Sequence, residues 1–214
     1  MTDARTEVLA RIGAALGGPT ADVVVPRSYR TAGDHTAGSS EVLDLLVDRL
    51  VDYKAHVVRV AAADVPAAIA AVIADLGAQP TVVAPDGLDP AWLADVPATV
   101  RHDSRTAPLS HLELDAVAAV VTASRVAIAD TGTIVLDGEP DQGRRAISLL
   151  PDVHVCVVRA DQVVQSVPEA VRLLAEHAER PQTWISGPSA TSDIELDRVE
   201  GVHGPRTLHV LVVG

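Results

Sequence analysis

Short valine-rich segments recur along this chain, separated by stretches in which apolar residues have helical spacing. The first three segments predict buried strands at 56–60, 81–84 and 99–102. Helical patterns alternate with them at 42–50, 64–76 and 89–93, the last with proline in its first turn. This alternation predicts an α/β fold of three layers, in which a largely parallel, doubly wound sheet is flanked by helices.

The apolar composition favours the same architecture. Hydrophobic residues make up 48% of the 214 residues, yet the chain has no Phe, two Trp and two Tyr. Small and β-branched side chains must therefore fill the core, as in parallel sheets covered by alanine-rich helices. A chain of this length is expected to form one domain.

The second half of the chain contains strands in closer succession. Apolar segments predict strands at 118–122, 126–129, 133–136, 153–158, 183–185 and 207–213. A helix is expected over 167–177, with Ser166 as its cap and Glu169 three residues later. We interpret residues 1–40 as an N-terminal helix, at 3–17, followed by an irregular segment, and residues 41–214 as a single α/β domain.

Charge and cysteine content exclude several classes of function. Seventeen basic and 29 acidic residues give a net charge of -12, which disfavours nucleic acid and anionic membrane surfaces as partners. The single cysteine, Cys156, allows no internal disulfide and cannot hold an iron–sulfur cluster. The sequence has no apolar run of about 18 residues and no secretory signal pattern. We expect a cytoplasmic protein without membrane insertion.

The segment ISGPSATSDIE, residues 185–195, follows an expected strand with a Gly-Pro turn, hydroxyl side chains and two acids. Unpaired N–H groups at a helix start, together with small hydroxyls, suit a phosphate or carboxylate. Alternatively, Ser192 and Glu195 form a capping box and the acids merely stabilise a first helical turn. Both can hold together, with Ser189 and Thr191 facing a ligand while Ser192 caps.

Three further loops carry polar groups with two interpretations each. Thr131-Gly132-Thr133 is either a tight hairpin or a turn that lets a ligand approach the main chain. The loop at 137–145 holds acids, an amide and two arginines, which suit acid–base or anion-clamping work or a solvated turn. In the segment 200–206, His203 could act as acid or base and Arg206 could hold a carboxylate, or His203 is structural.

Cofactor and metal motifs are missing from the sequence. It contains no dinucleotide-binding GxGxxG, no GxxxxGK[ST] phosphate loop, no GxSxG elbow, and no HExxH or CxxC pattern. His154 and Cys156 alternate on one strand face, but two such residues do not make a metal site and are expected to pack in the core. The sequence therefore predicts neither a cofactor nor a metal.

Two long segments, ADTGTIVLDGEPDQGRRAISLLPDVHVCVVRADQVVQSVPEA and TWISGPSATSDIELDRVEGVHGPRTLHVLVV, resemble the lactate-utilisation (LUD) domain family. The resemblance covers 115–214 strongly. It implies a fold similar to the glucosamine-6-phosphate deaminase, ribose-5-phosphate isomerase and CoA-transferase group, whose members bind anionic or acyl substrates at the carboxyl ends of parallel strands. It also implies a role in oxidising L-lactate to pyruvate, beside cysteine-rich and iron–sulfur partner proteins.

The resemblance and the loop chemistry together predict a cleft for a small anionic ligand. The residues expected to bind it are Thr131, Gly132, Thr133, Ser186, Gly187, Ser189, Thr191, Ser192, Asp193, Gly204 and Arg206. Arg206 is the expected counter-charge, and His203 and Glu195 are the candidate acid or base. A non-catalytic assembly subunit, or a free-standing isomerase, ligase or transferase acting on a phosphorylated or folate-like substrate, remains an alternative.

Overall fold

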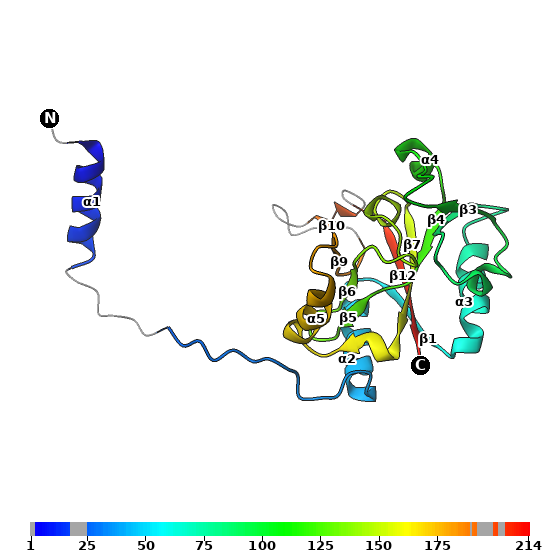
Figure 1. The fold of residues 1–214 in the computed structure, drawn as a ribbon, viewed down its shortest axis with the longest axis horizontal. Coiled ribbons are helices and arrows are strands. Elements are labelled where there is room, and N and C mark those ends of the chain that lie inside the picture. The colour runs from blue at the N-terminus through cyan, green and yellow to red at the C-terminus, as the bar shows by residue number, and fades with distance from the viewer. Residues whose placement is uncertain (1–2, 18–24, 189, 192–198, 201–203) are drawn as a thin grey trace. The chain divides into compact units, whose positions relative to one another are not determined.

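The computed structural model describes residues 3–17, 25–188, 190–191, 199–200 and 204–214. The chain divides into two compact units, residues 1–30 and 31–214. The first unit contains helix α1 (Ala4–Ala15), as the apolar spacing predicts, and none of the residues in α1 is buried. The second unit is an α/β domain (Figure 1).

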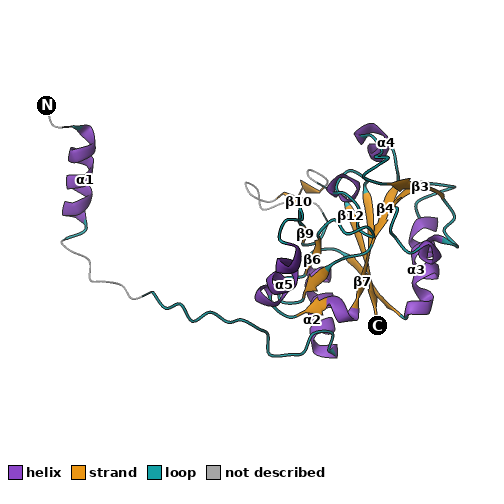
Figure 2. Ribbon diagram, viewed as in Figure 1, coloured by secondary structure: helices purple, strands orange, loops and turns teal. Residues whose placement is uncertain are grey.

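The domain is built on a sheet of six strands that all run parallel, in the order β1-β12-β7-β4-β2-β3. The strands are β1 (His56–Val60), β2 (Thr81–Pro85), β3 (Thr99–Asp103), β4 (Ala119–Thr122), β7 (Val153–Arg159) and β12 (Thr207–Val213). This confirms the predicted α/β class and its parallel sheet (Figure 2). The sheet is open, with β1 and β3 as its edge strands.

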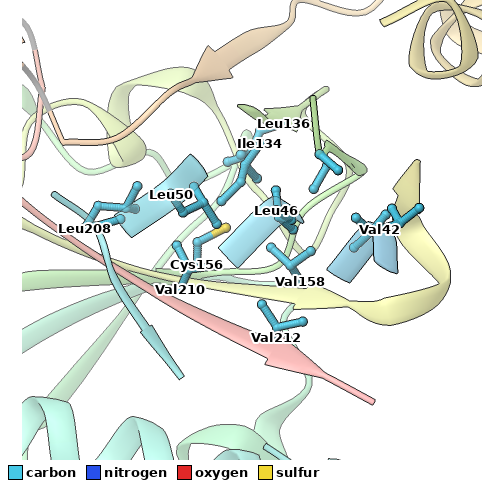
Figure 3. Close-up of a cluster of buried hydrophobic side chains, with 14 residues drawn as sticks. Val42, Leu46, Leu50, Ile134, Leu136, Cys156, Val158, Leu208, Val210 and Val212 are labelled. Atoms are coloured by element: carbon cyan, nitrogen blue, oxygen red, sulfur yellow. The ribbon is translucent and has the colours of Figure 1, made fainter. Parts of the chain in front are cut away.

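Helices cover both faces of this sheet because the central strands are apolar on both sides. One face packs against α3 (Val65–Ala74), which follows the short helix η1 (Ala62–Asp64), and against the 3-10 helix η2 (Pro90–Leu93). The other face packs against α2 (Ser40–Asp52), whose Val42, Leu46 and Leu50 are fully buried (Figure 3). Next to α2, α4 (His111–Asp115) and η3 (Arg145–Ser148) cover the same face through Leu114 and Ile147.

A second sheet of four strands lies beyond α2, in the order β8-β5-β6-β9. Its strands are β5 (Val126–Ile128), β6 (Thr133–Leu136), β8 (Val163–Val164) and β9 (Thr183–Ile185), and β8 follows the short helix η4 (Ala160–Gln162). Helix α5 (Val167–Leu174), continued by η5 (Ala175–His177), buries Ala170 and Leu174 against its outer side. Two further short strands, β10 (Ala190–Thr191) and β11 (Val199–Glu200), pair with each other in antiparallel fashion.

Residues 31–38 are attached to the domain by hydrogen bonds. The Gly33 amide donates to Glu169 at 3.1 Å, and the amides of Asp34 and His35 both donate to Gln165 Oε1, at 2.7 and 2.9 Å. The Gly38 amide donates to the Val163 carbonyl at 2.9 Å. The backbone ahead of α2 is therefore held by the end of β8 and the start of α5.

Charged residues mark both edge strands. Arg59 of β1 bonds Asp44 of α2 at 2.6 Å, and Arg101 of β3 bonds Glu113 of α4 at 2.7 Å.

Within the part of the chain that the structure describes, no helix combines the length and the apolar character needed to cross a membrane.

Candidate functional site

A cavity of about 310 Å³ lies where the loop after β9 meets the loop before β12. Its walls come from residues 182–188, from Gly204 and Pro205, and from the segment that begins at Arg145. His154 and Leu208, the second residues of β7 and β12, complete the lining. The cavity therefore lies at the amino ends of two central strands, whereas the family resemblance led us to expect the carboxyl ends.

Two of the loops singled out from the sequence are joined by hydroxyl groups. Thr133 Oγ1 lies 2.8 Å from Ser186 Oγ and 2.8 Å from Thr131 Oγ1. Thr133 is buried at 5% exposure, whereas Ser186 is exposed and lines the cavity. The three hydroxyls thus tie the β5–β6 turn to the end of β9 and set the position of Ser186. Thr131 and Thr133 do not line the cavity themselves.

Two glycines allow these loops to press against the end of α2. Gly132 has φ +57°, and a Cβ there would come within 2.8 Å of Arg49 Cβ. Gly187 has φ +80°, and its Cβ would come within 2.6 Å of Tyr53 Cβ and 2.7 Å of the Tyr53 carbonyl oxygen. Both conformations favour glycine. At Gly132 the missing side chain makes room for α2, whereas Gly187 also lines the cavity.

The two neighbouring arginines of the 137–145 loop have different surroundings. Arg144 makes a bidentate pair with the buried carboxylate of Asp103, with both N–O distances 2.8 Å, which raises the pKa of the arginine. Arg144 also donates to the Leu109 carbonyl. Arg145 is exposed at the cavity and forms no ion pair with any described residue. Arg145 is therefore a guanidinium that a bound anion can neutralise.

Two acids of that loop, Asp137 and Glu139, are paired with arginines from outside it. The buried Asp137 lies 3.3 Å from Arg180 Nη1 and 3.8 Å from Arg125, and Arg180 also bonds Glu139. The Asp137 backbone amide donates to Gln142 Oε1 at 2.7 Å and closes the turn. These contacts favour the structural interpretation of residues 137–143. Beside them, Arg105 and Arg144 border a second cavity of about 260 Å³ at the carboxyl ends of β2 and β3.

His154 lies at the inner wall of the first cavity with its ring fully buried. Its Nε2 is 2.8 Å from Thr122 Oγ1, and Nδ1 has no hydrogen-bond partner within the described ranges. Burial lowers the pKa of His154 to about 4, so the imidazole is neutral at pH 7. The sequence predicts core packing for His154, and the structure adds that it borders a cavity.

The predicted counter-charge, Arg206, borders a different hollow. That hollow, of about 410 Å³, also contains Lys54, His56 and Thr207, and it shares Pro188 with the cavity. Arg206 Nε lies 3.7 Å from Asp152, and both side chains are well exposed. Thr131 borders a third hollow with Arg49, Asp52 and Tyr53.

The remaining predicted site residues are not placed by the structure. Ser189, Ser192, Asp193, Glu195 and His203 lie outside the described residues, and Thr191 is described only through its backbone in β10. Of the predicted binding residues, the structure brings Ser186, Gly187 and Gly204 to the cavity. Sequence reasoning did not assign Arg145, His154 or Trp184 to this site. The one signal that the sequence offered was the Arg144-Arg145 pair. It indicated an anion-binding site but not which of the two arginines is ion-paired within the protein.

No group of three or more His, Cys, Asp or Glu side chains suited to a metal occurs among the described residues. Cys156 is buried and its pKa is raised to about 12 by burial, so its thiol stays protonated. The cavity thus offers hydrogen-bonding groups and the Arg145 guanidinium, which no described acid neutralises.

The family model described as the LUD domain matches residues 43–213. The chain belongs to the LUD domain family. Lactate utilization protein C of Deinococcus radiodurans is 46% identical to it over 214 residues, which is 99% of this chain and 96% of the relative. Lactate utilization protein C of Bacillus subtilis (strain 168) is 34% identical over 99 residues, covering 43% of this chain and 41% of the relative.

A solved LUD-type structure shows the same fold. The crystal structure of a DUF162 family protein from Deinococcus radiodurans aligns with a TM-score of 0.69 at 46% identity, over 82% of this chain and 98% of that one. The LUD domain match covers the whole parallel sheet, both walls of the cavity, and Arg145 and His154.

Proposed function

We propose that this LUD domain protein is a component of an L-lactate utilisation system and binds a small carboxylate in the cavity beside Arg145. The observation that carries the proposal is the exposed Arg145 guanidinium, which forms no ion pair with a described residue and lines the cavity together with Ser186. A carboxylate there would gain a charged, bidentate hydrogen bond. The relatives named lactate utilization protein C support the choice of a lactate-related ligand.

We infer that other proteins carry out the electron transfer. Its one cysteine is a buried thiol, and oxidation of lactate to pyruvate releases two electrons that need an acceptor. We therefore expect cysteine-rich and iron–sulfur partner proteins to carry the electrons. In this arrangement the LUD domain holds the organic acid and its partners complete the reaction.

Isothermal titration of the full chain with L-lactate, pyruvate, acetate and inorganic phosphate tests the binding. We expect a carboxylate to bind and Arg145→Gln to weaken that binding about tenfold or more, the loss expected for one charged hydrogen bond. Arg159→Gln is the matched control, because Arg159 is an exposed arginine at the opposite end of β7. Equal effects of the two variants would exclude a specific role for Arg145.

A non-catalytic assembly subunit is the second candidate, and Trp184 favours it. Its side chain is 43% exposed at the cavity rim, and exposed tryptophans are enriched at protein interfaces. Pull-down with the cysteine-rich and iron–sulfur proteins separates the two functions. If Arg145→Gln abolishes turnover and keeps assembly, the cavity binds the ligand; if Trp184→Ala abolishes assembly and keeps ligand binding, the rim is an interface.

A further inference from the structure

One buried nitrogen at the cavity has no hydrogen-bond partner among the described residues. His154 is fully buried, its Nε2 is 2.8 Å from Thr122 Oγ1, and its Nδ1 is unpartnered among the described residues. Buried polar side-chain atoms are nearly always hydrogen-bonded, so an exception calls for an explanation. Because His154 lines the cavity, a ligand is a candidate partner for Nδ1.

The neighbours of His154 determine which ring nitrogen carries the proton. The Cys156 thiol lies 3.8 Å from the Ala123 carbonyl oxygen, which can only accept, so the thiol donates there. Since the thiol then has no second proton, the Thr122 hydroxyl must donate to Cys156 Sγ at 3.8 Å. The hydroxyl has now used its own proton. We therefore assign His154 Nε2 as the donor in its 2.8 Å contact with Thr122 Oγ1.

This order of hydrogen bonds, from His154 Nε2 through Thr122 and Cys156 to the Ala123 carbonyl, leaves a lone pair on His154 Nδ1. A neutral imidazole carries one proton, and here that proton is on Nε2. Nδ1 can therefore only accept a hydrogen bond, and its partner has to bring a donor. Carboxylate and ketone oxygens have no donor, whereas an alcohol has one.

We propose that His154 Nδ1 accepts a hydrogen bond from the hydroxyl of a small hydroxycarboxylate whose carboxylate is bound by Arg145. The inference rests on the proposed carboxylate site and adds a residue that determines specificity: His154 favours the 2-hydroxy acid over the corresponding 2-oxo acid. A ketone oxygen at the same place would face the Nδ1 lone pair, and the nitrogen would stay without a donor. The loss of a matched buried hydrogen bond is a strong source of discrimination.

The proposal also requires a small movement. Water cannot reach the His154 ring in this structure, although the ring borders the cavity. A ligand hydroxyl therefore reaches Nδ1 only when the side chains that cover the ring move apart. Binding of a hydroxy acid should for this reason change the environment of Trp184, which shares the cavity wall.

The test compares L-lactate with pyruvate on the full chain by isothermal titration. We expect L-lactate to bind about tenfold more tightly, the ratio expected for one matched hydrogen bond. A long-range proton–nitrogen NMR spectrum of the histidine rings should show His154 protonated on Nε2, with Nδ1 shifting on addition of L-lactate and not of pyruvate. Equal binding of the two acids, or a proton on Nδ1, would overturn the proposal.

The Cys156→Ala substitution tests the donor–acceptor order of these hydrogen bonds at a residue that does not line the cavity. In Cys156→Ala, the Thr122 hydroxyl loses its acceptor and can donate to Nε2, which moves the ring proton to Nδ1. The preference for L-lactate should then disappear or reverse. An unchanged preference in Cys156→Ala would contradict the mechanism.

The outcomes separate this inference from the proposed function. If carboxylates bind, depend on Arg145 and show no preference for the hydroxy acid, only the role of His154 fails. If no carboxylate binds at millimolar concentration, the proposed function and this inference fail together. Tighter binding of L-lactate that survives Arg145→Gln would support His154 and contradict the Arg145 assignment.

Discussion

The backbone at Gly187 combines a φ of +80° with close packing against Tyr53, so this residue joins a local conformation to the shape of the cavity. In Gly187→Ala we expect the free energy of unfolding to fall by roughly 3 kcal/mol, from left-handed strain and from overpacking against Tyr53. Urea unfolding of the wild-type and variant proteins measures this fall in the free energy of unfolding. Gly138→Ala is the control, because Gly138 has a similar φ of +75° and its added Cβ would meet only the far end of the Arg105 side chain, at 3.1 Å, and the Gly143 carbonyl oxygen, at 3.7 Å. If both variants lost the same free energy of unfolding, Tyr53 would have moved away from the added methyl group without an energetic penalty.

The buried His154 ring makes the stability of the domain depend on pH. Burial lowers its pKa to about 4 from an ordinary 6.5. As the pH falls below 6.5, the unfolded chain binds a proton that the folded chain refuses until about pH 4, so stability is lost across this window. We expect this residue to contribute roughly 3 kcal/mol of the loss.

Denaturant unfolding between pH 7 and 4 tests this, with His154→Asn as the comparison. The variant starts less stable but should show a shallower decline, because the unfolded-state proton uptake at this position is gone. Parallel pH profiles for the two proteins would mean that His154 is protonated in both states or in neither.

At the start of α5, the Glu169 carboxylate accepts hydrogen bonds from two separate segments of the chain. Glu169 accepts from the Ser166 amide at 2.8 Å and from the Ser166 hydroxyl at 2.6 Å, and it also accepts from the Gly33 amide at 3.1 Å. Burial opposes ionisation of Glu169, but the hydrogen bonds outweigh it and lower its pKa. The helix start and the chain ahead of α2 thus depend on the same carboxylate.

We expect Glu169→Ala to lower the free energy of unfolding by about 1–2 kcal/mol, as for the loss of a helix cap. Hydrogen exchange should accelerate at the amides of Gly33 and Ser166. Glu179→Ala removes an exposed acid beyond the end of the helix and should change neither. Protection of Gly33 that survives Glu169→Ala would indicate that the bonds to Gln165 and Val163 are enough to hold this segment.

Elements with strong local signals were predictable, and short ones were not. The buried valine runs of β2, β4 and β7 and the helical spacing of α2 can be read from sequence because burial on one or both faces dictates apolar residues there. β8, with two residues, and α4, with five residues and one buried side chain, carry too little pattern. The second sheet could not be predicted, since β6 pairs with β9 across nearly fifty residues.

The site was predictable to a similar extent. The motif loops pointed to Ser186, Gly187 and Gly204, which the structure brings to one cavity. Arg145 and His154 join them only because η3 and β7 bring their amino ends to the same place, and a sequence pattern does not record such contacts between elements. The difference between Arg144 and Arg145 depends on Asp103, more than forty residues earlier.

On the scale of the whole molecule, the boundary between the two units can be tested by truncation. Removing residues 1–30 should leave the thermal midpoint of the domain unchanged, because the second unit starts at Thr31. Removing residues 1–38 also deletes the backbone donors that bond Gln165, Glu169 and Val163, and should cost roughly 2–4 kcal/mol. Similar midpoints for both truncated chains would place the domain boundary after residue 38.

The two edge strands of the parallel sheet each carry an arginine that is bonded to a helix of the same domain. An unpaired strand edge is a template for self-association, and charged side chains at the edge oppose it. A second copy that added its own β1 or β3 to either edge would bring like charges together or disrupt these ion pairs. The sheet is therefore protected against uncontrolled edge-to-edge aggregation, and this protection should weaken as salt screens the guanidinium groups.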